Sequence, residues 1–427
     1  MPMRTHTCGE LRSSDVNSDA TVCGWVNTFR DQGKGLVFID IRDRTGLTQA
    51  VFDQEDCEAE VMELARSLRR EDVVQIGGRV DPREGGKNPK LDTGEIEIRG
   101  TALKVFSRSN NPPILPDDHE ASKIAEDVRL RHRYIDLRRP TMQRTLQMRH
   151  DLSTLTREYF HNLGFLEVET PLLIKSTPEG ARDFIVPSRV YPGKWYALPQ
   201  SPQIFKQILM IAGCDRYMQI CKCLRDEDPR ADRQAEFTQI DLEMSFVDRD
   251  EIIKIMTGFV RRVFKQLLGL DLGQIPKVPW QLALDKWGVD RPDMRFQLHL
   301  QDISEIVAKT DFKVFQSALA KDRGVVKAIR IPQSADKLSR KIIDQLQETA
   351  KLHGAGGLPW TKVTENGFEG GVAKFIEGVS DELSAALEVE PGDTILMSCD
   401  EWLKACESLG QVRLHAARHL ELIDTTA

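Results

Sequence analysis

Residues 225–237 read RDEDPRADRQAEF, a run of acids and arginines that separates two apolar segments. The preceding segment, DRYMQICKCL at 215–224, has the composition of a strand, and FTQIDLEMSF at 237–246 alternates like a second strand. The stretch therefore predicts two strands that carry a charged loop. These two strands and their loop are the part of the sequence most indicative of the fold.

The charged loop has groups suited to a nucleoside triphosphate. Arg225 offers a planar fork of donors for a phosphate or a carboxylate, and Glu227 can hold a cation or an adenine amino group. Carboxylates beside arginines also suit Mg²⁺ bridged to phosphate oxygens. The alternative is a solvated hairpin tip, since exposed ion pairs are common and contribute only about 0–1 kcal/mol each.

Size and composition indicate an ordinary globular protein of two or three domains. The chain has 427 residues, of which 29% are charged and 40% hydrophobic, and its net charge is −7. We find neither an apolar run of about 20 residues nor a signal-peptide core, so the sequence predicts a cytoplasmic protein without a membrane contact. The net charge argues against nonspecific binding of nucleic acid, although a local basic face is enough for a tRNA.

The eight cysteines are scattered along the chain, and C-x-x-C pairs are absent from the sequence. Zinc knuckles and a disulfide framework are therefore not expected, and we predict no metal site built from protein ligands. The cysteines are interpreted as reduced packing residues.

The first hundred residues have the pattern of a small barrel. Alternating segments at 21–29, 36–41, 47–52, 73–80 and 95–106 predict five strands, and residues 57–70 predict a helix between the third and the fourth. This order is typical of an OB-fold, which binds single strands by stacking bases on exposed aromatic rings. Phe38, Arg30 and Gln49 are placed to stack, neutralise and hydrogen-bond, whereas the alternative puts Phe38 in the barrel core.

A proline-rich stretch at 107–116 predicts a hinge after the barrel. A helix is predicted next, from about Thr141 to Leu163, because its leucines recur every three or four residues and Gly164 supplies a C-cap. The segment GFLEVETP at 164–171 follows directly.

Three segments together resemble the class II aminoacyl-tRNA synthetases, and among them the bacterial-type aspartyl enzymes. Leu224-Arg225-Asp226-Glu227, closing at Glu236-Phe237, resembles motif 2 of that family. Residues 164–171 resemble motif 1, and STPEGARDF at 176–184 resembles the amino-acid-binding flipping loop.

The resemblance implies an α+β multidomain fold. An OB-fold anticodon-binding domain is expected at 1–107, a hinge at 108–140, an antiparallel-sheet catalytic domain with motifs 1 and 2 at 141–298, and a GAD-like α/β insertion at 299–427. It also implies a homodimer, because the helix and strand of motif 1 form the dimer interface of the family.

The resemblance assigns roles to single residues. Aspartate is expected to contact Glu179, Gln203, Lys206, Arg225 and Asp241, with Lys206 on its side-chain carboxylate. ATP is expected to contact Arg225, Asp226, Glu227 and Gln234, and Arg225 and Glu227 are the expected catalytic residues. Phe38, Arg30 and Gln49 match anticodon contacts.

The implied activity is that of an aspartate-tRNA ligase. Aspartate would attack the α-phosphorus of ATP, with Mg²⁺, and the aspartyl group would then pass to the terminal adenosine of tRNA-Asp. Whether tRNA-Asn is a second substrate is left open. Catalysis would come from alignment and from charge stabilisation by Arg225.

The family's third motif, Gly-x-Asp/Glu-Arg opening a helix, is missing. Gly288-Val289-Asp290-Arg291 has the letters, but Pro292 would disrupt the required helix. We therefore expect a chain truncated before motif 3 and impaired in forming adenylate.

Two other interpretations stay open. The chain could be a noncatalytic tRNA- or RNA-binding remnant, or a lysyl or asparaginyl synthetase, which shares the OB-fold and motif 2. The GAD-like segment and Glu179-Gly180-Ala181-Arg182-Asp183 favour aspartate over those sister enzymes.

Overall fold

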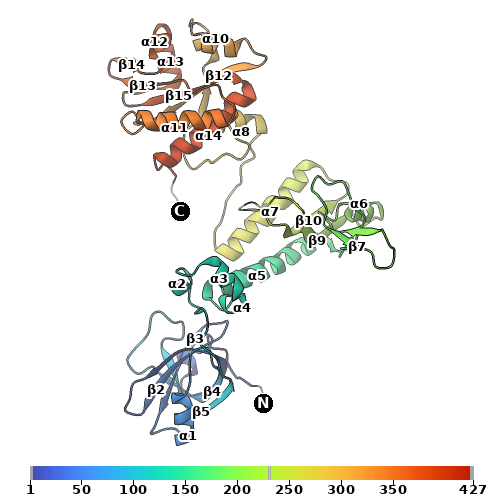
Figure 1. Cartoon of the computed structure of the whole chain (residues 1–427), viewed down its shortest axis with the longest axis vertical. Coiled ribbons are helices and arrows are strands. Elements are labelled where there is room, and N and C mark those ends of the chain that lie inside the picture. Colours follow the sequence, from blue (N-terminus) through green and yellow to red (C-terminus); the bar gives the residue numbers. More distant parts are fainter. Residues whose placement is uncertain (1–2, 229, 231, 424–427) are drawn as a thin grey trace. The chain divides into compact units, whose positions relative to one another are not determined.

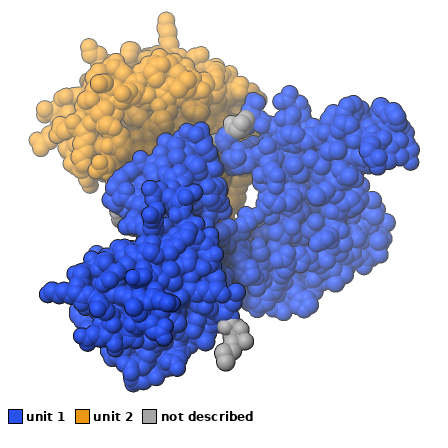
Figure 2. Space-filling model, turned by 60° about the horizontal axis from the view of Figure 1, so that its bottom comes forward, with its two compact units in different colours: residues 1–273 blue, residues 274–427 orange. Residues whose placement is uncertain are grey.

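The computed structural model describes residues 3–228, 230 and 232–423. It divides into two compact units, residues 1–273 and 274–427, which Figure 2 shows in different colours. Each unit is described by itself.

The first unit begins with the predicted barrel. After a short 3₁₀ turn (η1, Ser13–Asp15), its strands are β1 (Asp19–Asp31), β2 (Leu36–Arg42), β3 (Leu47–Asp53), β4 (Val73–Pro82) and β5 (Ile96–Ser107), and they close in the order β1-β2-β3-β5-β4. Helix α1 (Ala59–Arg66) lies between β3 and β4 in sequence (Figure 1). The predicted strands and the helix are confirmed, although α1 is shorter than 57–70.

Three short helices follow the barrel: α2 (Asp118–Ala121), α3 (Glu126–Arg131) and α4 (Arg133–Asp136). Arg138 joins this segment to the barrel, since its Nη1 lies 2.7 Å from Oε2 of Glu71 and its guanidinium lies 4.7 Å from the ring of Trp25. Arg42 meets the same carboxylate at 2.8 Å in a buried pair. The predicted hinge region is thus held to the barrel through the buried carboxylate of Glu71, which Arg138 reaches from the hinge.

The rest of the first unit starts with the long helix α5 (Pro140–Asn162), and Gly164 takes the left-handed conformation (φ 81°) that its place after a helix favours. β6 (Leu166–Glu167) follows, and with β9 (Arg216–Leu224) and β10 (Glu236–Met244) it forms a three-stranded sheet in the order β10-β9-β6. β9 and β10 pair antiparallel, but β6 pairs parallel to β9. The expected antiparallel sheet is therefore wrong in this detail, and the sheet is mixed.

Helices and a small second sheet flank these strands. α5 and α7 (Arg249–Leu268) pack an apolar core against one face of the sheet, around Phe160 and Phe259. β7 (Ile185–Pro187) and β8 (Trp195–Ala197) pair with each other and precede α6 (Gln203–Ile211).

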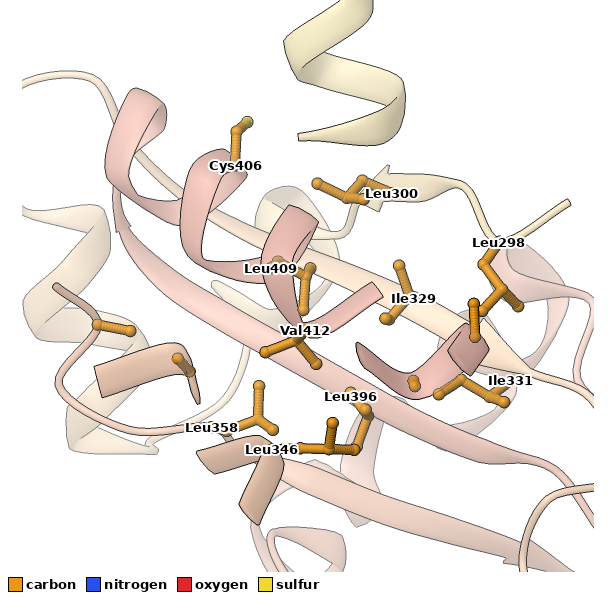
Figure 3. Close-up of a cluster of buried hydrophobic side chains, with 14 of the residues drawn as sticks. Leu298, Leu300, Ile329, Ile331, Leu346, Leu358, Leu396, Cys406, Leu409 and Val412 are labelled. Atoms are coloured by element: carbon orange, nitrogen blue, oxygen red, sulfur yellow. The ribbon is translucent and has the colours of Figure 1, made fainter. Parts of the chain in front are cut away.

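The second unit is a five-stranded antiparallel sheet with a hydrophobic core on each face. β11 (Leu300–Asp302), β12 (Gly324–Ile331), β15 (Thr394–Glu401), β13 (Trp360–Thr364) and β14 (Gly367–Glu369) lie in that order. One core, shown in Figure 3, contains α8 (Trp280–Trp287), α11 (Arg340–Leu352) and α14 (Trp402–His419). The other contains α9 (Ser304–Val307), α10 (Lys313–Leu319), α12 (Ala373–Ile376), the 3₁₀ turn η2 (Glu377–Val379) and α13 (Ser380–Leu387).

The boundary between the units differs from the expected one at 298/299. The second unit begins at Gln274, because Leu284 of α8 and the following Phe296 and Leu298 are buried in its core. Gly288 ends α8 in a left-handed C-cap (φ 72°), and the residues directly after it form no helix in the described structure. The interpretation that Gly288-Val289-Asp290-Arg291 is not motif 3 agrees with this geometry.

No helix among the described residues is long and apolar enough to span a bilayer.

Candidate active site

The two long strands β9 and β10 present one apolar and one polar face. In the β9–β10 register, Asp241 lies opposite Gln219, and Phe237 lies opposite Cys223. Successive side chains of a strand alternate between faces. One face therefore carries Met218, Ile220, Ile240, Leu242 and Met244, which pack under α5 and α7. The opposite face carries Tyr217, Gln219, Cys221 and Cys223 with Phe237, Gln239, Asp241 and Glu243.

Lys206 brings a buried positive charge to the polar face. From α6 its Nζ donates to Oδ1 of Asp241 at 2.9 Å and lies 3.4 Å from Glu243. Burial disfavours the ammonium, but the hydrogen bond and charge of Asp241, helped by Glu243, outweigh it and raise the pKa of Lys206. Lys206 is thus a charged group at neutral pH.

One carboxylate oxygen of Asp241 is left without a protein partner in the described part of the chain. Its Oδ2 is buried and has no hydrogen-bond partner among the described residues. Tyr217 lies beside it, and burial together with the Asp241 charge raises the pKa of that phenol. A buried carboxylate oxygen without a partner is costly unless a donor such as an ammonium arrives.

Glu179 is placed by the loop that resembles the flipping loop. Its carboxylate accepts hydrogen bonds from Thr177 (3.0 Å) and Ser201 (2.6 Å). The side chain of Gln200 is buried and exchanges hydrogen bonds with the backbone of Ala181 at 2.9 and 3.0 Å. The loop is therefore fastened to the segment that precedes α6. Gln200 and Ser201 were not predicted as site residues, and the flanking Pro199 and Pro202 were the only signal in the sequence.

Arg225 lies at the charged loop, where the structure has a cavity of about 370 Å³. Its guanidinium lies 5.1 Å from the Phe237 ring, and its Nε is buried without a partner among the described residues. The cavity is lined by Arg225, Glu227, Asp228, Asp232, Arg233, Gln234, Ala235 and Phe237. Three of the four predicted ATP residues, Arg225, Glu227 and Gln234, thus share one cavity.

Asp226 does not line this cavity. Its side chain is exposed, and its amide donates to the carbonyl of Arg182 at 3.0 Å, which ties the charged loop to the flipping loop. Arg233 was missed by the sequence analysis, although it lines the cavity and its Nη1 lies 3.7 Å from Oε2 of Glu227. An arginine in a run of alternating charges carries no local signal that separates it from its neighbours.

Lys206 and Arg225 lie on the same face of the sheet, but Lys206 does not line the cavity of about 370 Å³ that contains Arg225. Cys221 and Cys223 lie between them along β9, with their sulfur atoms 3.7 Å apart. Gln203 begins α6 one turn before Lys206, and no hydrogen bond to its side chain is seen in the described part of the chain.

The predicted RNA-binding residues of the barrel lie together. Arg30 on β1 lies opposite Phe38 on β2 in the strand register. The Nη2 of Arg30 donates to Oε1 of Gln49 at 3.2 Å. Phe38 is half-buried on the outer face, since Val37 and Ile39 fill the interior. The alternative of a core Phe38 is therefore wrong.

Two further side chains fix Gln49, which is itself buried. Arg83 donates to its Oε1 at 2.7 Å, and its Nε2 donates to Glu97 at 2.8 Å. The sequence analysis missed both, because they come from β5 and the segment after β4, far from β3 in the chain.

No cluster of three or more histidine, cysteine or acidic side chains able to hold a metal is found among residues 3–228, 230 and 232–423.

Two family models match this chain. Residues 125–384 match the family described as tRNA synthetases class II (D, K and N), and residues 20–106 match the OB-fold nucleic acid binding domain.

Curated relatives and solved structures agree. The chain is 49% identical over 425 residues to an aspartate-tRNA(Asp/Asn) ligase of Caldanaerobacter subterraneus, a match that covers 99% of this chain and 71% of that protein. An aspartate-tRNA ligase of Bacillus licheniformis is 47% identical with the same coverage. The asparaginyl-tRNA synthetase of Pyrococcus horikoshii, solved with asparaginyl-adenylate, superposes with a TM-score of 0.57 at 20% identity over 96% of each chain, which shows a shared fold.

Proposed function

This chain belongs to the class II tRNA synthetases, a family of ligases, and we propose that it is built to activate aspartate with ATP and transfer it to tRNA. The observation that supports this most directly is a pair of buried atoms, Nε of Arg225 and Oδ2 of Asp241, that have no hydrogen-bond partner among the described residues and lie on one sheet face with the charged Lys206. Aspartate carries two carboxylates and one ammonium. The face offers two cations and one free carboxylate oxygen, which is the complementary set.

In the first step, a carboxylate oxygen of aspartate attacks the α-phosphorus of ATP, the bond to the bridging oxygen of pyrophosphate breaks, and aspartyl-adenylate forms. We assign Lys206 to the side-chain carboxylate, Asp241 and Glu179 to the ammonium, and Gln203 to the rim of the same pocket. Arg225 would neutralise the charge that develops on the α-phosphate.

In the second step, a hydroxyl of the terminal adenosine of the tRNA attacks the carbonyl carbon, and AMP leaves with the bonding electrons. The hydroxyl proton passes to the leaving phosphate or to water. The protein would contribute alignment in both steps, because neither requires a nucleophile from the chain.

Glu227 and Asp228 provide carboxylates at the cavity that also contains Arg225. Mg²⁺ is usually held by one or two carboxylates plus substrate phosphates, so these residues fit an ion that arrives with ATP. When bound, the ion would neutralise phosphate oxygens. Gln234, at the same cavity, would contact the nucleotide.

The barrel is the proposed anticodon reader. Phe38 would stack on a base, Arg30 would neutralise a phosphate, and Gln49, held by three neighbours, would read a base edge. tRNA-Asp is the proposed substrate, and charging assays with tRNA-Asp and tRNA-Asn would decide whether both are accepted.

Exposed apolar side chains support a homodimer through motif 1. Leu146 on α5 is 48% exposed, Leu166 on β6 is 56%, and Leu173 is 54%. Light scattering should give twice the chain mass of 48.4 kDa, whereas a monomeric mass would contradict the dimer.

The segment from about 299 onward is proposed to be the GAD-like insertion. Because no Gly-x-Asp/Glu-Arg opens a helix among the described residues, we also propose that the chain forms adenylate slowly. An arginine on the transferring phosphoryl group is worth roughly 10³-fold or more in rate. A deficit of that size relative to the Bacillus licheniformis enzyme is expected, and an equal rate would contradict it.

The direct test is pyrophosphate exchange into ATP with aspartate, asparagine or lysine as the amino acid. Aspartate alone should support exchange, and Arg225→Ala should abolish it. Faster exchange with asparagine or lysine would assign the chain to a sister enzyme. Failure to exchange with or to bind any of the three would favour the noncatalytic RNA-binding remnant.

A further inference from the structure

The second unit contains a groove of about 700 Å³ that the proposed aminoacylation does not use. Its walls come from α10, α11, the loop at 356–360, residues 371–372 and the end of β15, all of them within residues 274–427. β13 pairs with β15 over Trp360–Lys362, so the end of β15 at Cys399 and Asp400, which pairs with β12 on its other edge, borders the groove on its β13 side. A space of this size matches a small-molecule site.

Two glycines in the groove have no role that the fold explains. A Cβ added to Gly356 or Gly357 would meet no atom within 4 Å, and neither residue has a left-handed backbone. Gly371, in the same groove, differs: its φ is +51°, and a Cβ there would lie 1.9 Å from the carbonyl oxygen of Trp360. Gly371 is thus required by the fold, whereas the missing side chains at 356 and 357 leave open space for close approach of a ligand.

The charged groups of the groove favour an anion. Lys313, Lys321 and Arg340 line it, against a single carboxylate, Asp400. Lys321 meets Asp400 at 2.5 Å, and Arg340 lies 3.1 Å from Asp344 in an exposed pair. Lys313 has no ion pair among the described residues. Lys313 therefore offers an ammonium to an anionic group, and Arg340 offers a planar guanidinium that lies 5.4 Å from the Trp360 ring and whose ion pair with Asp344 is exposed.

The same groove has an apolar side. Phe312, Val314, Leu358 and Val372 line it, and Phe312 stacks on Phe375 with ring centroids 4.4 Å apart at 26°. Val314 is 47% exposed and Phe375 is 53% exposed. Apolar and aromatic walls beside cations suit a planar ring that carries a phosphate.

We propose that this groove binds a nucleotide, with its phosphate at Lys313 and Arg340 above Gly356 and Gly357, and its base against Phe312 and Val314. The site goes beyond the proposed ligase function, since the described residues that line the groove all belong to the second unit.

AMP binding to the 427-residue protein, followed by calorimetry, tests this. The parent for all variants carries Arg225→Ala, so that binding at the candidate active site is weakened. The parent should still bind AMP, and adenosine should bind at least about tenfold more weakly because it lacks the phosphate. Adding Lys313→Gln with Arg340→Gln should weaken AMP by roughly tenfold or more, and adding Gly357→Leu should abolish binding by filling the groove.

Two controls keep the result interpretable. Lys351→Gln removes a charge from the same helix as Arg340 but outside the groove, and it should leave AMP affinity unchanged. Gly357→Leu should keep the urea midpoint of the parent, since nothing lies within 4 Å of its Cβ. The proposal is overturned if the parent binds no AMP, if adenosine binds as tightly, or if the groove variants bind AMP like the parent. Aspartate-dependent exchange tests the ligase function separately.

Discussion

Lys206 is held charged in a site that is largely closed to water, with 11% of its side chain exposed and 10% of that of Asp241. Lys206→Met should lower the free energy of unfolding by about 3–5 kcal/mol, because Asp241 would be left as a buried carboxylate without a counter-charge. The exposed pair of Lys222 with Glu236 is the matched control, and Lys222→Met should cost about 1 kcal/mol or less.

The pH dependence of that loss follows from the raised pKa of Lys206. A raised native pKa stabilises the fold fully below the unfolded value of about 10.4, and the contribution is lost as pH rises through the native value. The difference in free energy of unfolding between wild type and Lys206→Met, measured with urea, should therefore be the same at pH 7 and pH 9. It should become smaller at pH values above the pKa of Lys206 in the unfolded chain. A gap that grows with pH would contradict the charge assignment.

Substitution of Phe38 tests the proposed RNA-binding face of the barrel. Phe38→Ala should weaken tRNA binding by about 1–3 kcal/mol, since one stacking surface is lost. Leu36→Ala, on the same outer face of β2, serves as control and should leave binding unchanged. Ile39→Ala, which empties an interior position, should instead cost about 2–5 kcal/mol of stability. Filter binding and urea unfolding separate these outcomes, and equal tRNA affinity for Phe38→Ala would remove the stacking role.

Single residues were predictable where a motif spaces them along the chain. Arg225, Glu227 and Gln234 stand within ten residues of one another, and they line one cavity. Gln200 and Arg83 could not be found that way, because each acts on a residue distant in sequence: Gln200 on Ala181, and Arg83 on Gln49. The roles of the predicted residues toward aspartate, ATP and tRNA remain predictions.

Elements were predictable where the pattern is long. The barrel strands and α5 follow from alternation and from helical spacing over seven or more residues. β6 has two residues, so its parallel pairing with β9 depends on where α5 delivers the chain and not on a local pattern. The amphipathic pattern of α8 predicts a packed helix but not the unit against which it packs. Its contacts with the core of the second unit assign it there.

Gly410 allows a test of the α8–α14 contact. It lies in α14, where alanine is intrinsically favoured by up to about 1 kcal/mol. A Cβ at 410 would lie 2.5 Å from the carbonyl oxygen of Gly288, which is backbone and has little room to move. Gly410→Ala should therefore destabilise the second unit by about 1–3 kcal/mol.

The control is Gly378→Ala, since a Cβ at 378 meets nothing within 4 Å. It should change the urea midpoint little. A Gly410→Ala protein with a higher urea midpoint than wild type would show that α14 does not approach the backbone of Gly288 as closely as described.

At the scale of the molecule, the chain consists of two units joined by an exposed segment. α7 ends at Leu268 and α8 begins at Trp280, and residues 268–277 are all exposed. Exposed segments without hydrogen-bonded structure are cut first by proteases. Brief digestion should therefore give two fragments separated within 269–279, as measured by intact mass. First cuts inside the barrel or within α5 would contradict this division.

The central claim is that the polar face of β9 and β10 is built for aspartate and ATP together. Calorimetry with non-hydrolysable sulfamoyl analogues of aspartyl- and asparaginyl-adenylate tests it most directly, because binding does not depend on turnover. We predict at least about 100-fold tighter binding of the aspartyl analogue, and loss of that preference in Lys206→Met. Equal affinity for the two analogues, or an unchanged preference in Lys206→Met, would contradict the account.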